Sequence, residues 1–233
     1  MNSDLRAREF GPLDSYSGRC WPFDTVPGVL GLHLSAALDD HSDWAEAVAG
    51  HMRWIRGPGR DARLDLPVSF VSSAKRSASA PRGCDLSLRQ GLTELLDLEL
   101  AREHWRAYTR HFWQEQLWAG GFREYPRGAS GQSDIDSGAI LAGMGFVATA
   151  FGLGAAACAG DSGRTARLAG MFRMTSALVG AGKLAMHLPP LRTLPPRYRR
   201  MFDAKAETGF LFGDVCLLHS LSWPAFVHAE RMR

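Results

Sequence analysis

Four acidic residues, each followed by an apolar segment, constrain the fold of this chain more than any other feature. The acids are Asp24, Asp85, Asp136 and Glu207, at irregular intervals. The apolar segments span residues 25–38, 86–97, 137–158 and 208–221, and amphipathic patterns follow the first three at 42–56, 98–114 and 164–180. A helix that is apolar on all sides must be surrounded by protein, whereas one with an apolar stripe can form an outer layer. The pattern predicts an all-α chain of about four helical hairpins.

An arrangement in two concentric layers accommodates both the apolar and the amphipathic helices. We expect residues 1–233 to form a single α/α-toroid domain, with apolar inner helices and amphipathic outer helices. In such a ring the inner helices begin at one end, so the acids that precede them would converge around a central cavity. Loops are expected at 57–67, 72–84 and 119–135, which are rich in Gly, Pro and Ser.

The composition of the chain indicates which partners, cofactors and cellular location to expect. Lys and Arg number 27 against 24 Asp and Glu, and the basic cluster at 192–200 lies among prolines, which favours a solvated loop over a nucleic-acid surface. The cysteines show neither a CxxC pair nor a Cys/His spacing suited to zinc, and no phosphate or dinucleotide fingerprint is present, so we expect no metal and no cofactor. The N-terminal residues lack the apolar segment of a secretory signal, which favours a cytoplasmic location.

Residues 137–160 carry no charge over a length that could cross a bilayer. Most of them are Gly or Ala, which contribute little to insertion, and small residues at four-residue spacing let helices pack closely in protein cores as well as in membranes. We therefore expect a buried helix within a soluble protein. Membrane association of a non-catalytic scaffold, with this segment as its span, stays the alternative.

Polar residues gather in the loops before the apolar segments, as in a pocket with an apolar floor and a polar rim. We predict Asp24 and Asp136 as a catalytic acid/base pair, because a partly desolvated carboxyl group can hold a proton for delivery to a leaving hydroxyl. Cys20 is a second polar contact or a nucleophile, since a helix start favours the thiolate. The predicted substrate-binding residues are Trp21, Arg82, Cys84, Asp85, Arg123, Glu124, Tyr125 and Asp134.

Each of these residues also has a purely structural interpretation. An acid at a helix start stabilises the helix by capping and through the helix dipole, without any catalysis. Arg82 and Arg123 are expected to form ion pairs with Glu124 or Asp134 across the rim. The cysteines can equally be buried and inert.

Four stretches of the sequence resemble the C-terminal half of linalool dehydratase/isomerase and its bacterial relatives. They are GRCWPFDTVPGVLGLHL, DWAEAVAGHMRWIR, GGFREYP and DIDSGAILAGMGFVATAFGLGAAACAGD, within residues 11–161. The resemblance implies an α/α toroid and cofactor-independent acid/base chemistry that removes or moves the hydroxyl of a monoterpene alcohol. By position, Cys20 matches one of the two pocket cysteines of that family, and the place of the other falls near Gly11. The catalytic Asp, Tyr and His of the family lie in an N-terminal half that has no counterpart here.

Three functions follow as hypotheses. The first is a lyase or isomerase that acts on a small apolar alcohol. The second keeps the fold but makes the chain a glycoside hydrolase or lyase, with paired carboxylates and with Trp21 and Trp118 stacked on sugar rings. The third is the non-catalytic scaffold. Since a closed toroid usually has more hairpins, three alternatives stay open: the chain lacks an N-terminal part of the ring, it closes the ring as a homo-oligomer, or it has lost the activity.

Overall fold

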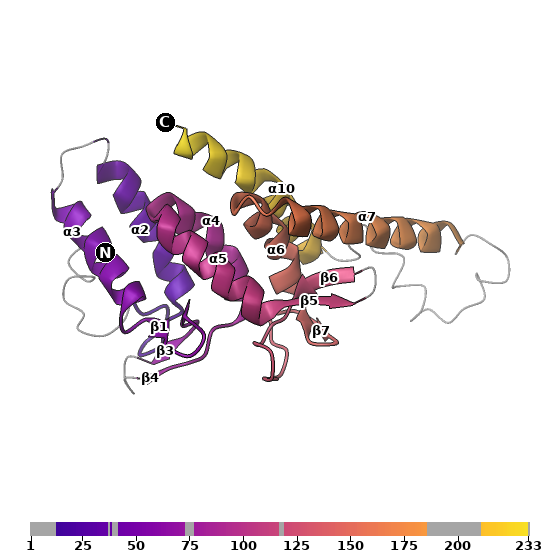
Figure 1. Cartoon of the computed structure of the whole chain (residues 1–233), viewed down its shortest axis with the longest axis horizontal. Helices are drawn as coiled ribbons and strands as arrows, with labels where there is room; N and C mark the ends of the chain where they lie inside the picture. The colour runs from indigo at the N-terminus through magenta and orange to yellow at the C-terminus, as the bar shows by residue number, and fades with distance from the viewer. Residues whose placement is uncertain are drawn as a thin grey trace.

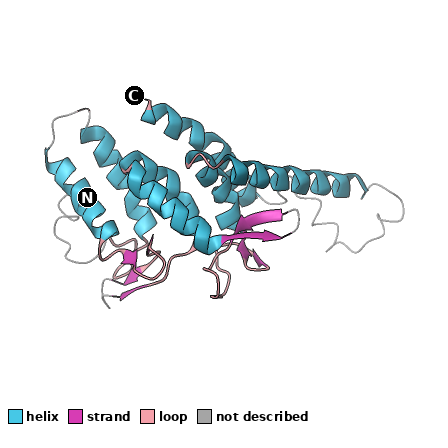
Figure 2. Ribbon diagram, viewed as in Figure 1, coloured by secondary structure: helices cyan, strands magenta, loops and turns pink. Residues whose placement is uncertain are grey.

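The structure, a computed structural model, describes residues 13–36, 38, 42–72, 77–116, 119–185 and 211–232. Most of this part of the chain is helical (Figure 2). The helices are α2 (Pro22–Ala36), α3 (Ser42–Arg56), α4 (Gly83–Leu96), α5 (Leu98–Phe112), α6 (Phe146–Cys158), α7 (Ser162–Ala185) and α10 (Leu211–Arg231). The mostly helical class expected from the sequence is therefore confirmed.

Short strands pair into antiparallel two-stranded hairpins beside the helices. They are β1 (Arg60–Asp61) with β2 (Leu66–Pro67), β3 (Val71–Ser72) with β4 (Ser77–Ala78), β5 (Trp113–Gln116) with β6 (Ala119–Phe122), and β7 (Ile140–Leu141) with β8 (Met144–Gly145). These hairpins lie in segments that precede α4 and α6. They shape the loops from which the polar residues project.

The helices form two sets that match the two kinds of sequence pattern (Figure 1). Helix α2 packs against α4, α4 against α6, and α10 against both α6 and α4. On the other side, α3 packs on α2, α5 on α4 and α7 on α6. Each of α2, α4 and α6 thus pairs with the helix that follows it in the chain.

Helix α6 is the centre of the packing because its small residues let its neighbours approach closely. A Cβ at Gly152 would come within 2.4 Å of the Phe122 ring, and one at Gly154 within 2.9 Å of the Ser220 backbone on α10. Ser220 Oγ also donates a hydrogen bond of 2.6 Å to the carbonyl of Ala150. Gly152 and Gly154 therefore serve close contacts of α6 with β6 and with α10.

The core between α5, α6 and β6 is aromatic. The rings of Tyr108 and Phe122 stack at 4.5 Å between centroids, and Trp105 meets Phe122 edge-on at 5.6 Å. Tyr108 and Phe122 are almost completely buried. Each such side chain contributes roughly 1.5–3 kcal/mol of hydrophobic stabilisation, so this cluster fixes the position of β6 and of the residues that follow it.

The expected helix over 137–158 is wrong in its first part. Helix α6 begins only at Phe146, and residues 140–145 form the β7–β8 hairpin, whose turn residues Ala142 and Gly143 have φ of 50° and 85°. Positive φ at both central residues is the geometry of a tight hairpin turn. No helix in the described ranges combines the length and apolar character needed to cross a membrane. Glu207, the expected start of the fourth unit, lies outside the described residues.

The loops before α2, α4 and α6 are joined at one end of the molecule. Cys20 pairs with Val71, the N–H of Arg82 donates to Ser69 Oγ at 2.8 Å, and Arg123 pairs with Met144. Polar side chains from segments far apart in the sequence therefore meet where these helices begin.

Candidate functional site

Glu124 lies at the centre of this meeting point. Its N–H donates to the carbonyl of Gly143 at 3.2 Å, and its carbonyl accepts the N–H of Gly83 at 2.9 Å. Its side chain is completely buried. The residue is thus held between the start of α4 and the β7–β8 hairpin.

The Glu124 carboxylate stabilises the start of α4 from a distant part of the chain. Oε2 accepts the N–H of Cys84 at 3.2 Å, and Oε1 accepts Arg82 Nε at 2.8 Å and the Cys84 thiol at 3.1 Å. The N-cap residue of α4, Arg82, makes no capping hydrogen bond with its own side chain. An acid at this point satisfies a free N–H and interacts favourably with the helix dipole.

Arg82 joins Glu124 to a second carboxylate. Its Nη1 and Nη2 donate to the two oxygens of Asp134 at 2.6 and 3.0 Å, and the guanidinium lies 5.7 Å from the centre of the Tyr125 ring. The expected ion pairs are therefore correct for Arg82. For Arg123 the expectation is wrong, because its guanidinium donates to Gln114 Oε1 at 2.5 Å and to the Tyr125 carbonyl at 3.1 Å.

The two carboxyl groups on Arg82 differ in acidity. Burial raises the pKa of Glu124, although Cys84 and Arg82 oppose the shift. The hydrogen bonds from Arg82 lower the pKa of Asp134 to about 2, and the N–H of Ser137 supports the same shift. Two carboxyl groups with separated pKa values are the usual arrangement of an acid and a base in one site.

Asp85 belongs to an adjoining buried network. It accepts hydrogen bonds from Ser69 Oγ and from Arg89, whose Nε lies 2.9 Å from Oδ1. Arg89 also donates to the carbonyl of Val68 at 3.0 Å. This network ties the loop before α4 to the first turns of that helix. A structural role therefore accounts for the buried position of Asp85.

Neither cysteine of the predicted site presents a thiolate to solvent. Burial raises the pKa of Cys84 well above its usual range, and the nearby Glu124 carboxylate adds to the shift. Cys20 is completely buried and packs with Val68 and Val71. The thiol of Cys84 acts as a hydrogen-bond donor to Glu124.

The predicted catalytic pair, Asp24 and Asp136, lies on the surface. Both residues are exposed, and the N–H of Asp136 donates to Asp134 Oδ1 at 3.1 Å. Trp21 is half-buried and contacts the rings of Tyr16 and Phe70 at their edges. Trp118 lies outside the described residues. The desolvation expected for the acid pair is found at Glu124 and Asp85 instead.

An apolar groove of about 250 Å³ lies between the β7–β8 hairpin, α6 and α7. Met144, Phe146 and Phe172 are among the residues that line it, and so is Gly145. A Cβ at Gly145 would be 2.8 Å from Glu124 Oε2, so this groove residue lies close to the carboxylate, which does not itself line the groove. Sequence reasoning missed the groove because its walls come from separate segments, and the hairpin was expected to be helical.

A much smaller cavity of about 10 Å³ lies between α4, α5 and β2. It is lined by Arg89 and His104, whose Nη1 and Nε2 are buried without a hydrogen-bond partner. A cavity of this size with a donor on one side and an acceptor on the other can hold one water molecule.

The described ranges contain no group of three or more His, Cys, Asp or Glu side chains that could hold a metal ion. No model of a known protein family and no curated protein matches the chain.

Proposed function

We propose that this chain is a lyase or isomerase that removes or moves the hydroxyl group of a small apolar alcohol by acid/base chemistry, without a cofactor. The observation that carries the proposal is the completely buried Glu124 carboxyl group, which lies next to Gly145 on the wall of an apolar groove and is joined through Arg82 to Asp134. The apolar groove suits the hydrocarbon part of such a substrate.

Glu124 is the proposed acid and Asp134 the proposed base. Glu124 gives its proton to the hydroxyl oxygen, the C–O bond breaks and water leaves. A proton on the neighbouring carbon passes to Asp134, and a double bond forms between the two carbons. Exchange with solvent then returns the two carboxyl groups to their starting states. Addition of water at a different carbon moves the hydroxyl, which is the isomerase reaction.

The resemblance of the sequence to linalool dehydratase/isomerase supports the same reaction class and an α/α toroid. In this proposal, α2, α4, α6 and α10 belong to the inner wall of the ring and α3, α5 and α7 to the outer wall. The acid role passes from the exposed Asp24 and Asp136 to the buried Glu124, and the base role passes to Asp134, which is exposed but is held by Arg82.

The test is turnover of monoterpene alcohols and other small apolar alcohols, followed by gas chromatography of the products. We expect the wild-type chain to form alkenes or rearranged alcohols. Glu124→Gln and Asp134→Asn are each expected to lower the rate by about 10²–10⁴-fold, the usual contribution of a general acid or base. Because Asp134 is partly exposed, its variant is expected to fold even if the buried substitution is damaging.

Glu99→Gln is the matched control, since Glu99 is an exposed carboxylate on α5. It should leave the rate unchanged. A loss of activity in Asp24→Asn or Asp136→Asn, with full activity in Glu124→Gln, would return the acid/base role to the surface pair. Turnover of oligosaccharides but not of alcohols would contradict the proposal and favour the carbohydrate-active hypothesis.

A further inference from the structure

One polar atom of the buried Arg89 has no partner in the network around Asp85. Nε and Nη2 of Arg89 donate to the Asp85 carboxylate, and Nη2 also donates to the carbonyl of Val68 at 3.0 Å. Nη1 is buried and has no hydrogen-bond partner among the described residues. Removing a charged N–H donor from water without giving it an acceptor costs free energy, so a partner for Nη1 is expected.

His104, on α5, has an unpartnered atom of the complementary kind. The residue is almost completely buried, and its Nε2 has no hydrogen-bond partner in the described part of the chain. Burial, together with the positive charge of Arg89, lowers the pKa of this imidazole to about 3. The ring is therefore neutral at neutral pH, and one nitrogen of a neutral imidazole can accept a hydrogen bond.

Arg89 and His104 line the same cavity between α4, α5 and β2. Its volume of about 10 Å³ is close to the space that one water molecule needs. Thr93 also lines the cavity, and its hydroxyl donates to the carbonyl of Arg89 at 2.9 Å. Because the proton of this hydroxyl is already used, the Thr93 oxygen can only accept a further hydrogen bond.

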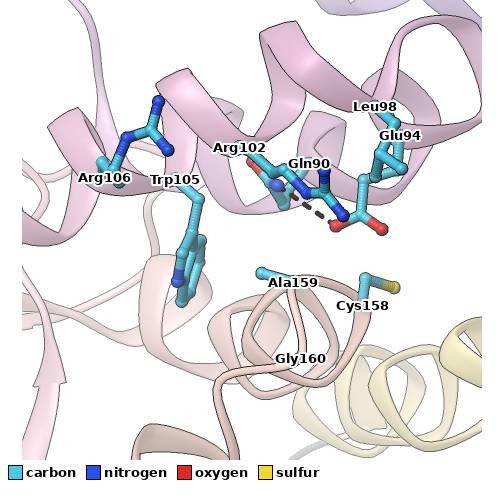
Figure 3. A pocket seen from close by; sticks show the side chains of 9 residues that line it. All are labelled: Gln90, Glu94, Leu98, Arg102, Trp105, Arg106, Cys158, Ala159 and Gly160. Atoms are coloured by element: carbon cyan, nitrogen blue, oxygen red, sulfur yellow. Dashed lines mark hydrogen bonds between the residues drawn. The ribbon is translucent and has the colours of Figure 1, made fainter.

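Gln90 separates this cavity from a larger pocket of about 310 Å³, which lies between α4, α5 and the turn from α6 to α7 (Figure 3). The residue lines both spaces, and its Nε2 donates to Glu94 Oε1 at 3.2 Å and to the carbonyl of Ala101 at 3.1 Å. These hydrogen bonds hold the amide between the two spaces. A molecule in the smaller cavity is therefore expected to exchange slowly with solvent.

We propose that the smaller cavity is a binding site for a single water molecule that joins α4 to α5. The water accepts a hydrogen bond from Arg89 Nη1, donates one to His104 Nε2 and donates its second hydrogen to Thr93 Oγ1. Three partners are the usual number for a buried water. The guanidinium charge disfavours a cation at this position, and the volume admits no molecule larger than water. The inference does not depend on the proposed catalytic function.

The water completes a chain of hydrogen-bonded groups from α5 to the residue that holds the two carboxylates of the candidate site. Arg89 donates to Asp85, and Asp85 accepts the hydroxyl of Ser69. The same hydroxyl oxygen accepts the N–H of Arg82 at 2.8 Å. The bound water thus extends the network that fixes the loop before α4 as far as α5.

The first test is ¹⁵N NMR of the full chain at pH 8. If Nε2 of His104 accepts a hydrogen bond, the proton of the neutral ring lies on Nδ1, and the ¹⁵N shifts of the two ring nitrogens distinguish this tautomer from the other. A nuclear Overhauser contact between a bound water and the Nη1 protons of Arg89 is expected as well. A proton on Nε2 would overturn the proposal, and so would a guanidinium without a water contact.

The second test counts slowly exchanging water molecules by oxygen-17 relaxation dispersion. His104→Phe removes the acceptor and enlarges the ring, so this variant should hold one such water fewer than the wild type. His111→Phe is the matched control, because His111 lies on the same helix but does not line the cavity. An unchanged count in a folded His104→Phe protein would refute the site. Should that variant fail to fold, the tautomer and the water contact in the wild type decide.

Discussion

Replacing His104 with glutamine should make folding less sensitive to acid. His104 lies on α5 and is 6% exposed, and its Nε2 is buried without a hydrogen-bond partner. Burial lowers its pKa from 6.5 to about 3, and the positive charges of Arg89, Arg60 and Arg56 act in the same direction. The folded protein therefore keeps this imidazole neutral at a pH where the unfolded chain protonates it.

The size of the effect follows from the two pKa values. Below pH 6.5 the unfolded chain binds a proton that the folded chain binds only near pH 3, so the free energy of unfolding falls as the pH falls. Between pH 8 and pH 5 the loss from His104 is about 2 kcal/mol. His51, whose pKa burial lowers to about 4, adds a loss of the same sign. Glu124 and Asp85 act in the opposite direction, because their pKa values are raised.

The assay is urea denaturation of the wild type and His104→Gln at pH 8 and pH 5. The difference in free energy of unfolding between the two pH values should change by about 2 kcal/mol in the variant, with the variant relatively more stable in acid. His228→Gln, at an exposed position on α10, should behave as the wild type. An identical pH dependence in the wild type and His104→Gln would refute the reasoning.

Three further variants test the packing and the hydrogen bonds, each by urea denaturation at pH 8. Gly152→Ala places a Cβ 2.4 Å from the Phe122 ring and should cost about 1–3 kcal/mol, whereas no loss would show that β6 can move aside. Tyr108→Phe removes the hydroxyl that lies 2.7 Å from Ser87 Oγ and should cost about 1–3 kcal/mol; an unchanged midpoint would mean that this hydrogen bond does not stabilise the fold. Asp97→Ala removes the N-cap of α5 and should cost about 1 kcal/mol, while Asp97→Asn should keep most of that stability.

The amphipathic helices could be predicted closely from the sequence because their pattern is local. Helix α3 spans Ser42–Arg56, as the periodicity indicated, and α5 ends two residues before its expected limit of 114. The β7–β8 hairpin could not be predicted, because its Gly and Ala residues fit a buried helix as well as a turn. The helix and the turn differ in the backbone of Ala142 and Gly143, whose φ angles are positive in the structure because of tertiary contacts that the local sequence does not reveal.

Three residues of the candidate site could be grouped from the sequence, but the contacts between them could not be predicted. Arg82, Glu124 and Asp134 were recognised as polar residues in loops before apolar helices, and an acid at a helix start was expected to be the chemical group. Asp24 has that local position but is exposed. Glu124 reaches the start of α4 from 40 positions along the chain, and such a long-range contact leaves no signal in local sequence.

The most direct measurement is the titration of individual carboxyl groups by ¹³C NMR. The account predicts that Glu124 titrates above its ordinary value of 4.5 and Asp134 near 2. Glu124→Gln should remove the first of these transitions and so assign it. A Glu124 carboxyl that titrates at or below 4.5 would contradict the central claim that this buried group is held as the acid of the site.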